Sequence, residues 1–359
     1  MSNPIQEVIN LGQSIWFDNI QRRAIKNGEL KYLIDSGDIR GITSNPSIFN
    51  QAITNSDDYD EDIKNLAANG LNSQEVFWKL AVKDIQDASD LFLPLYYETK
   101  GKDGFVSLEV NPEYSQDPTA TFLEAKGLWA EVDRPNLMIK IPATQKCIPA
   151  IKESIAFGIN VNVTLIFSID RYREVMQAYI EGLMERVQSG LAISNISSVA
   201  SFFISRIDSK IDPLLPNDSG RKGKSAIANA KLAYLEFERL FSDRVFLELK
   251  EKGGQLQRPL WASTSTKNER YPDTLYIDEL IGPDTVNTIP PHTLEAFREH
   301  GVPGLTLTRE QMEAKQLIND LKSEGISFKK VTDELEREGI KAFVDSFSDL
   351  IKAIERKIG

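Results

Sequence analysis

A lysine in an alternating run of residues is the first group in this sequence that could carry out covalent chemistry. In LMIKI, residues 137 to 141, alternation places Met138 and Lys140 on one face of a strand and the apolar neighbours on the other. An amine kept uncharged by a buried environment is a nucleophile toward carbonyl compounds. Two carboxylic acids, Asp18 and Glu109, lie at the ends of similar runs and could move the protons that such a reaction requires.

Other strand-like runs place polar residues in the same phase as Lys140. The pairs expected to face the same interior are Trp16 with Asp18, Thr43 with Asn45, Ser107 with Glu109, Asn162 with Thr164, Ser201 with Phe203, and Trp261 with Ser263. Most pairs finish on a polar or ionisable residue at or near the end of the strand. Buried polar groups are costly unless they bond to one another or to a ligand. The pattern therefore predicts a polar site at one end of a sheet.

Each of these residues also has an ordinary structural explanation. A lysine in an alternating strand is usually on the solvated face. Asp18 is consistent with a helix cap and Asn45, before Pro46, with a turn. The remaining alternatives are a surface cation paired with Glu109, a mutual hydrogen bond between Asn162 and Thr164, and a packing role for Ser201. Only the shared phase of all these residues favours a common site.

The elements that would position this site alternate between short strands and amphipathic helices, which is typical of repeated βα units. The eight expected strands are Ser14 to Asp18, Gly41 to Asn45, Phe105 to Val110, Leu137 to Pro142, Asn160 to Ile166, Val199 to Ser205, Pro259 to Ser263 and Thr285 to Ile289. The expected helices between them include Pro118 to Val132, Asp170 to Gln188, Ser225 to Phe241 and Thr293 to His300. Eight such units predict an α/β protein with a (β/α)8 barrel.

Two further helical regions extend this barrel. Residues 54–100 contain helical patterns around Tyr59 to Ala68 and Ser73 to Leu91, which indicates an inserted helix pair. From Thr308 to residue 359 the pattern is helical only, and these helices are expected to pack outside the barrel. Length does not require a second domain, so residues 1–359 are interpreted as one. The pattern leaves open whether the last helices cover the barrel, form an interface or close over the site.

Composition narrows the classes of function. The chain has 359 residues, 41% of them hydrophobic, and a formal net charge of -11, which disfavours binding to nucleic acid and to anionic membranes. The single cysteine, Cys147, cannot form an intrachain disulfide, and residues 1–10 lack the pattern of a signal peptide, so a cytoplasmic location is expected. Because His292 and His300 have no Cys or His neighbour at ligand spacing, no metal is expected.

At the candidate site residues the sequence resembles the transaldolase family over nearly its whole length. GITSNPSIF, from Gly41 to Phe49, is similar to the first family signature, and NLMIKIPAT, from Asn136 to Thr144, to the second, which carries a Schiff-base lysine. Further similar segments are GFVSLEV, INVNVTLIFS, ASFFISRID, WASTSTKN and YIDELIGPDTVNTIPP, the last typical of the longer bacterial branch.

The resemblance implies a (β/α)8 fold and transfer of a dihydroxyacetone unit between sugar phosphates, without a cofactor. It assigns the Schiff base to Lys140, the acid and base role to Asp18, and proton transfer through a water to Glu109 with Thr164. Substrate binding is assigned to Thr43, Asn45, Asn162, Ser201, Phe203, Arg206, Ser263, Ser265 and Lys267. Arg206 and Lys267 are the expected phosphate cations, since guanidinium and ammonium groups both bind phosphate. Which hydroxyl of Ser263, Ser265 and Thr266 binds phosphate stays open.

This sequence departs from the family pattern at two places, and two other functions remain. Gln145 to Cys147 stands where an acidic residue and a glycine are usual, and Glu269 stands where close relatives carry a proline. The alternatives are a fructose 6-phosphate aldolase, which releases free dihydroxyacetone, and a non-catalytic barrel that binds sugar phosphates. Phe203, Glu109 and the chain length favour transfer over release. The oligomeric state, including a homo-oligomer, stays open.

Overall fold

The computed structural model describes residues 3–359 and contains a closed barrel of eight parallel strands. Strand neighbours follow the order of the sequence, and β8 pairs with β1 to close the barrel. The strands are β1 Gln13–Asp18, β2 Gly41–Thr43, β3 Phe105–Glu109, β4 Leu137–Pro142, β5 Val161–Ile166, β6 Ser198–Phe203, β7 Gln257–Ala262 and β8 Thr285–Ile289. The predicted (β/α)8 fold is therefore confirmed.

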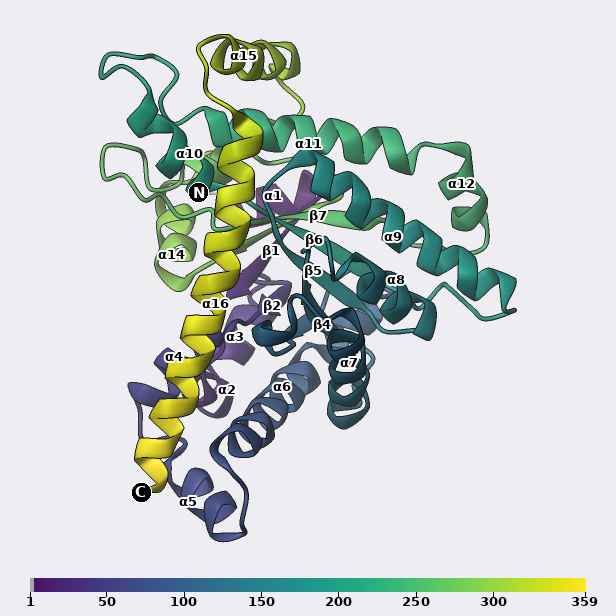
Figure 1. The fold of residues 1–359 in the computed structure, drawn as a ribbon, viewed down its shortest axis with the longest axis vertical. Coiled ribbons are helices and arrows are strands. Elements are labelled where there is room, and N and C mark those ends of the chain that lie inside the picture. The colour runs from purple at the N-terminus through teal and green to yellow at the C-terminus, as the bar shows by residue number, and fades with distance from the viewer. Residues whose placement is uncertain (1–2) are drawn as a thin grey trace.

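Helices surround this barrel and extend it at both added segments (Figure 1). They are α1 Pro4–Asn10, α2 Arg22–Lys26, α3 Glu29–Asp35, α4 Pro46–Thr54, α5 Asp60–Ala68, α6 Ser73–Glu98, α7 Pro118–Val132, α8 Ile148–Phe157, α9 Ile169–Gln188, α10 Ser205–Ile211, α11 Ser225–Phe241, α12 Arg244–Glu251, α13 Leu275–Asp278, α14 Pro291–His300, α15 Gln311–Ser323 and α16 Phe328–Ile358. Two short 3-10 turns complete them, η1 Pro112–Tyr114 and η2 Asp212–Leu214. Among these residues no helix is long and apolar enough to cross a membrane.

Two strands, β2 and β6, end two residues earlier than the sequence indicated, because a helix begins close behind each of them. Asn45 lies beyond β2, where its side chain accepts a hydrogen bond from the backbone N–H of Ile48 and caps α4. Ser205 is the first residue of α10 rather than the last of a strand. Asp18, in contrast, caps no helix, since the N-cap of α2 is Gln21.

Strand β7 has the opposite phase to the one expected. Its register pairs Ser201 with Leu260 and Phe203 with Ala262, so Leu260 and Ala262 face the interior. Trp261 faces outward instead and packs on Phe202, with ring centroids 6.1 Å apart. The prediction of an inward Trp261 was wrong because apolar residues alternate here with apolar residues, which gives no sign of the buried face.

The barrel interior is filled below the rim by large side chains. Trp16 is fully buried, and a Cβ atom on Gly41 of β2 would lie 2.6 Å from its indole ring. Glycine at position 41 is therefore what allows the two strands to enclose this ring. At the bottom of the barrel, Arg258 forms an ion pair with Asp103 at 3.1 Å and donates a hydrogen bond to Ser14. The open end of the barrel is thus the rim where the strands finish.

Helix α16 crosses this rim. It packs against α4, α6, α10, η1 and β5, which follow or include the C-terminal ends of several strands. Figure 1 shows it as one long helix that runs from the region of α10 to that of α5. Helix α16 therefore covers the barrel, and its Phe343 also reaches over Lys140 at the rim, so the structure combines two of the arrangements that the sequence left open.

The helical insertion is joined to the barrel by a buried polar cluster. Tyr59 donates a hydrogen bond of 2.8 Å to Asp84 of α6, and Arg22 of α2 forms an ion pair of 2.7 Å with the same carboxylate. We expect Tyr59→Phe to lower the free energy of unfolding by about 1.5 to 3 kcal/mol, because a buried charged acceptor loses its donor. Equilibrium unfolding in urea measures this.

The matched control for this substitution is Tyr97→Phe, since Tyr97 is 65% exposed. Its free energy of unfolding should stay within about 0.5 kcal/mol of the unsubstituted chain. Equal effects of the two substitutions would show that the hydroxyl of Tyr59 does not stabilise the insertion.

Candidate active site

A cavity of about 370 Å³ opens at the C-terminal rim of the barrel. Active sites of such barrels form at this face, from side chains at the strand ends. The cavity brings together eleven of the residues predicted from sequence, namely Asp18, Thr43, Asn45, Lys140, Thr164, Ser201, Phe203, Arg206, Ser263, Ser265 and Lys267. Two predicted residues do not line it, Glu109 and Asn162, and each contacts a residue that does.

Lys140 lies at the centre of the site and is 5% exposed. Its Nζ donates a hydrogen bond of 3.0 Å to the backbone carbonyl of Ser44 and lies 3.2 Å from the carboxylate of Glu109. The hydrogen bond to Ser44 is possible because strand β2 is short and ends at Thr43, so the chain leaves the barrel wall at Ser44. The amine is therefore held at the rim beside a carboxylate that can take its proton.

Glu109 of β3 lies beside Lys140 in the sheet register and is buried. Burial raises its pKa to about 7, although the neighbouring ammonium of Lys140 opposes the shift and the charge of Asp18 adds to it. The hydroxyl of Thr164 is also buried, and it has no hydrogen-bond partner within residues 3–359. A carboxyl group with this pKa can both accept and return a proton near neutral pH.

Asp18 is the second carboxylate of the site and takes part in a chain of hydroxyl groups. Thr43 donates a hydrogen bond of 2.7 Å to Asp18, and its oxygen lies 2.6 Å from the hydroxyl of Thr288 in β8. Burial raises the pKa of Asp18, while Lys140, Thr43 and Lys267 oppose the shift. A desolvated carboxylate is a stronger base than one in water, as abstraction of a hydroxyl proton requires.

Asn162 supports the cavity wall from one layer below. It is fully buried, donates a hydrogen bond to the hydroxyl of Ser107, and accepts one of 2.7 Å from Ser201. The alternative of a mutual hydrogen bond between Asn162 and Thr164 is thus not what forms, because Asn162 is already bonded on both sides. The hydroxyl of Ser201 is fixed in orientation as a result, and Ser201 is more than a small packing residue.

Two cations lie together at one end of the cavity. Lys267 donates a hydrogen bond of 3.0 Å to Ser265, while the Arg206 guanidinium stacks 5.5 Å from the ring centroid of Phe203. Neither forms an ion pair with a carboxylate anywhere in residues 3–359. Burial lowers the pKa of Lys267, and the charge of Arg206 lowers it further. Two neighbouring cations without counter-ions favour an anionic ligand group.

The side chain of Ser263 reaches the cavity because of its backbone conformation and not because of strand alternation. It follows the end of β7 with a positive φ of 56°, which turns its side chain toward the cavity and within 3.0 Å of the Ser205 hydroxyl. Strand alternation therefore predicted Ser263 as a cavity residue correctly, although the alternation in β7 was assigned to the wrong face.

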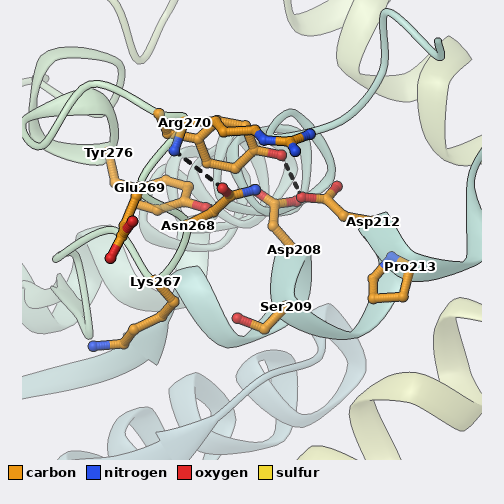
Figure 2. Close-up of a pocket in the computed structure, with 10 residues that line it drawn as sticks. Asp208, Ser209, Asp212, Pro213, Lys267, Asn268, Glu269, Arg270 and Tyr276 are labelled. Carbon is orange, nitrogen blue, oxygen red and sulfur yellow. Dashed lines mark hydrogen bonds between the residues drawn. The ribbon is translucent and has the colours of Figure 1, made fainter. Parts of the chain in front are cut away.

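A second cavity, of about 530 Å³, adjoins the first and shares Lys267 with it (Figure 2). Two of its carboxylates are already engaged, because Asp212 accepts a hydrogen bond from Tyr271 and Asp208 accepts one from Tyr276. Glu269, one of the departures from the family pattern, lines this cavity and not the candidate site. Lys267 lines both cavities, and in Figure 2 its amine extends away from Arg270.

The other departure lies farther from the chemistry. Cys147 is fully buried at the start of α8, with its sulfur 3.3 Å from the backbone carbonyl of Ser115 and 3.5 Å from the hydroxyl of Thr121. Gln145 accepts a hydrogen bond from Arg171. These contacts stabilise the turn after β4 without reaching the cavity.

Sequence reasoning missed seven residues that line the cavity. They are Ser47, Gln51, Ala262, Thr288, Pro290, His292 and Phe343. Thr288 could have been found, because it is the last polar residue of the expected strand Thr285 to Ile289, for which no inward-facing pair was assigned. Phe343 had no such signal, since it comes from α16 and reaches the site only through the tertiary fold.

The structure is a parallel eight-stranded barrel that holds a buried lysine beside two carboxylates at its C-terminal rim. This arrangement is that of an enzyme that acts on carbonyl compounds through an amine nucleophile. Comparison with known proteins agrees with this class. Residues 15–354 match the model of the Transaldolase/Fructose-6-phosphate aldolase family. The chain belongs to that family.

Full-length relatives lie within the transaldolase part of the family. The chain is 44% identical over 365 residues to the transaldolase of Parafrankia sp. (strain EAN1pec), covering 100% of this chain and 99% of the relative. It is 43% identical to the transaldolase of Thermobifida fusca, covering 100% and 99%, and 44% identical to that of Trichodesmium erythraeum, covering 100% and 98%.

Proposed function

We propose that this enzyme transfers a dihydroxyacetone unit from sedoheptulose 7-phosphate to glyceraldehyde 3-phosphate, giving erythrose 4-phosphate and fructose 6-phosphate. The observation that carries the proposal is the buried pair of Lys140 and Glu109, 3.2 Å apart, beside a cavity that also holds Asp18 and two unpaired cations. The full-length similarity to transaldolases supports the same activity.

The first half of the reaction joins the ketose to Lys140. The amine adds to the ketose carbonyl, and the resulting carbinolamine loses water to become an iminium. Glu109 is next to the amine and has the pKa for this exchange, so it receives the amine proton and returns it to the leaving hydroxyl group through a water. Thr164, whose buried hydroxyl has no hydrogen-bond partner within residues 3–359, is proposed to hold that water.

The second half breaks and forms a carbon–carbon bond. Asp18 removes the proton of the hydroxyl group on the far carbon of the bond that breaks, that carbon becomes an aldehyde, and the bonding electrons move into the iminium, which becomes an enamine. The shortened sugar phosphate leaves as an aldehyde. The enamine then adds to the acceptor aldehyde, Asp18 returns the proton to the new hydroxyl group, and hydrolysis of the iminium frees Lys140. No cofactor takes part in this sequence.

Substrate binding follows from the cavity lining. Arg206 can bind a phosphate group through two hydrogen-bond donors, and Lys267 can bind it through its single charge. These two cations explain how a protein with a net charge of -11 could bind a phosphorylated substrate. Thr43, Asn45 and Ser201 offer hydrogen bonds to hydroxyl groups, with Phe203 as an apolar wall. The proposed partners are therefore sugar phosphates, and the proposed location is the cytoplasm, in keeping with one buried thiol and an acidic surface.

The nearest alternative is an aldolase that releases dihydroxyacetone from fructose 6-phosphate, since the family model includes both activities. Phe203 at the cavity wall and the full-length transaldolase relatives favour transfer. A non-catalytic barrel that binds sugar phosphates would have no need for an amine paired with a buried carboxyl group.

The test combines trapping with a product assay. The protein is mixed with fructose 6-phosphate, reduced with borohydride and digested, and peptide masses locate the adduct; erythrose 4-phosphate is then supplied and the products are measured. A dihydroxyacetone adduct on Lys140 together with sedoheptulose 7-phosphate is the expected result. Free dihydroxyacetone as the main product would favour the aldolase, and the absence of an adduct on every lysine would refute the Schiff base.

The raised pKa of Glu109 predicts the pH dependence of this reaction. Below pH 7 Glu109 is protonated and can no longer accept the amine proton during Schiff-base formation. We expect kcat/KM to rise with pH through an apparent pKa of about 7, the value that burial gives Glu109. Glu109→Gln has no carboxyl group to titrate, and this limb should disappear as kcat falls by about 10- to 100-fold.

Steady-state rates between pH 5 and 9, in buffers of constant ionic strength, measure this limb. Glu113→Gln is the control, because Glu113 lies in η1, shortly after the end of β3, and outside the cavity. An unchanged acidic limb in Glu109→Gln would assign the titration to another group.

A further inference from the structure

Phe343 of α16 lies over the reactive amine. Its ring centroid is 5.5 Å from Nζ of Lys140, and the side chain lines the cavity that contains Asp18 and Thr164. The ring is only 6% exposed, although it comes from a helix outside the barrel. An apolar ring at this position occupies space from which water would otherwise reach Lys140.

Several contacts fix α16 at this height above the rim. A Cβ atom on Gly339 would lie 3.0 Å from the side chain of Leu165, so the glycine allows the helix to approach the end of β5 closely. One turn beyond Phe343, Ser346 hydrogen-bonds to Ser47 of α4 at 2.8 Å. Phe347 packs edge-on against Phe77 of α6. The ring of Phe343 is therefore held by packing on both sides of it, as a precise cover requires.

Water is the main competitor in the reaction proposed above. After the carbon–carbon bond breaks, Lys140 carries a dihydroxyacetone enamine. Transfer joins this enamine to an aldehyde. In the competing route a water molecule in the place of the acceptor gives a proton to the enamine carbon and takes the proton that Asp18 holds. The resulting iminium is hydrolysed to free dihydroxyacetone and the amine. Hydrolysis of an iminium ends both routes, so they differ only in whether an aldehyde or a proton delivered through water reaches the enamine carbon.

We propose that Phe343 is a specificity-determining residue that favours transfer over release by keeping water away from the enamine carbon of the intermediate on Lys140. This inference rests on the proposed function. Closure of an active site by apolar groups is a known means of preventing proton leakage and other side reactions of reactive intermediates. The bulk of the side chain, more than its aromatic character, carries the effect.

The test measures the ratio of free dihydroxyacetone to transferred product when fructose 6-phosphate and erythrose 4-phosphate are supplied together. Phe343→Ala removes the cover, and the ratio should rise by about tenfold, equivalent to about 1.4 kcal/mol. Phe343→Leu keeps most of the apolar volume, and its ratio should stay within about twofold of the unsubstituted enzyme. An unchanged ratio in Phe343→Ala, or equal rises in both variants, would overturn the proposal.

Two controls separate this effect from others. Lys357→Met removes a hydrogen bond of 2.9 Å from α16 to the carbonyl of Ser56, far along the helix from Phe343, and should leave the ratio unchanged. A rise as large as that of Phe343→Ala would mean that loosening the helix is sufficient and that the ring itself has no role. Borohydride trapping on Lys140 accompanies every variant: an enzyme without an adduct refutes the proposed function, whereas an adduct with an unchanged ratio refutes only the role of Phe343.

Discussion

Replacing Lys140 with methionine is expected to lower kcat for dihydroxyacetone transfer by at least about 10⁴-fold, because the nucleophile of the proposed mechanism is removed. Methionine is close in length to lysine and suits a site that is 5% exposed. The substitution leaves Glu109 buried without its cation, and the carboxyl group can then hold its own proton. We therefore expect a folded protein without activity.

Loss of activity in this variant is informative only with two further measurements. Lys146→Met removes an exposed lysine from the loop that follows β4, and it should retain the full rate. Borohydride trapping should give no adduct in Lys140→Met under conditions that label the unsubstituted enzyme. A persistent adduct, or a rate within a hundredfold of the original, would place the nucleophile elsewhere.

The strand phases of β1, β4 and β5 were predicted correctly from the sequence. Lys140, Asp18 and Thr164 alternate with apolar residues, so burial of one face also fixes where the polar residue points. In β7 this argument failed, since Leu260, Trp261 and Ala262 are all compatible with either face. Periodicity therefore locates a site only in strands where the residues of one face are polar and those of the other face are apolar.

The site features that could not be predicted from the sequence depend on contacts between segments that are far apart along the chain. Phe343 and Lys140 are about 200 positions apart, and nothing in the local pattern of α16 distinguishes the ring over the site from Phe347, which packs on α6. Similarly, the hydrogen bond from Lys140 to Ser44 depends on where β2 ends and α4 begins. Helix ends are set by caps and tertiary packing, and their positions are the least certain part of a sequence pattern.

Asp18→Asn is expected to separate the two halves of the reaction. The amide oxygen can still accept the hydrogen bond that Thr43 donates to Asp18 at 2.7 Å, so the geometry of the site should be retained. The amide cannot take a proton, and kcat should fall by about 10²- to 10⁴-fold. Schiff-base formation depends on Glu109 and not on Asp18, so it should continue.

Trapping distinguishes this outcome from a general loss of function. With fructose 6-phosphate and borohydride, the unsubstituted enzyme should carry the three-carbon dihydroxyacetone adduct on Lys140, whereas Asp18→Asn should carry the intact six-carbon sugar phosphate. Asp170→Asn, which changes an exposed carboxylate at the start of α9, should behave as the unsubstituted enzyme. If Asp18→Asn formed the three-carbon adduct at the original rate, the base for bond cleavage would have to be another group, and Glu109 is the other buried carboxylate beside Lys140.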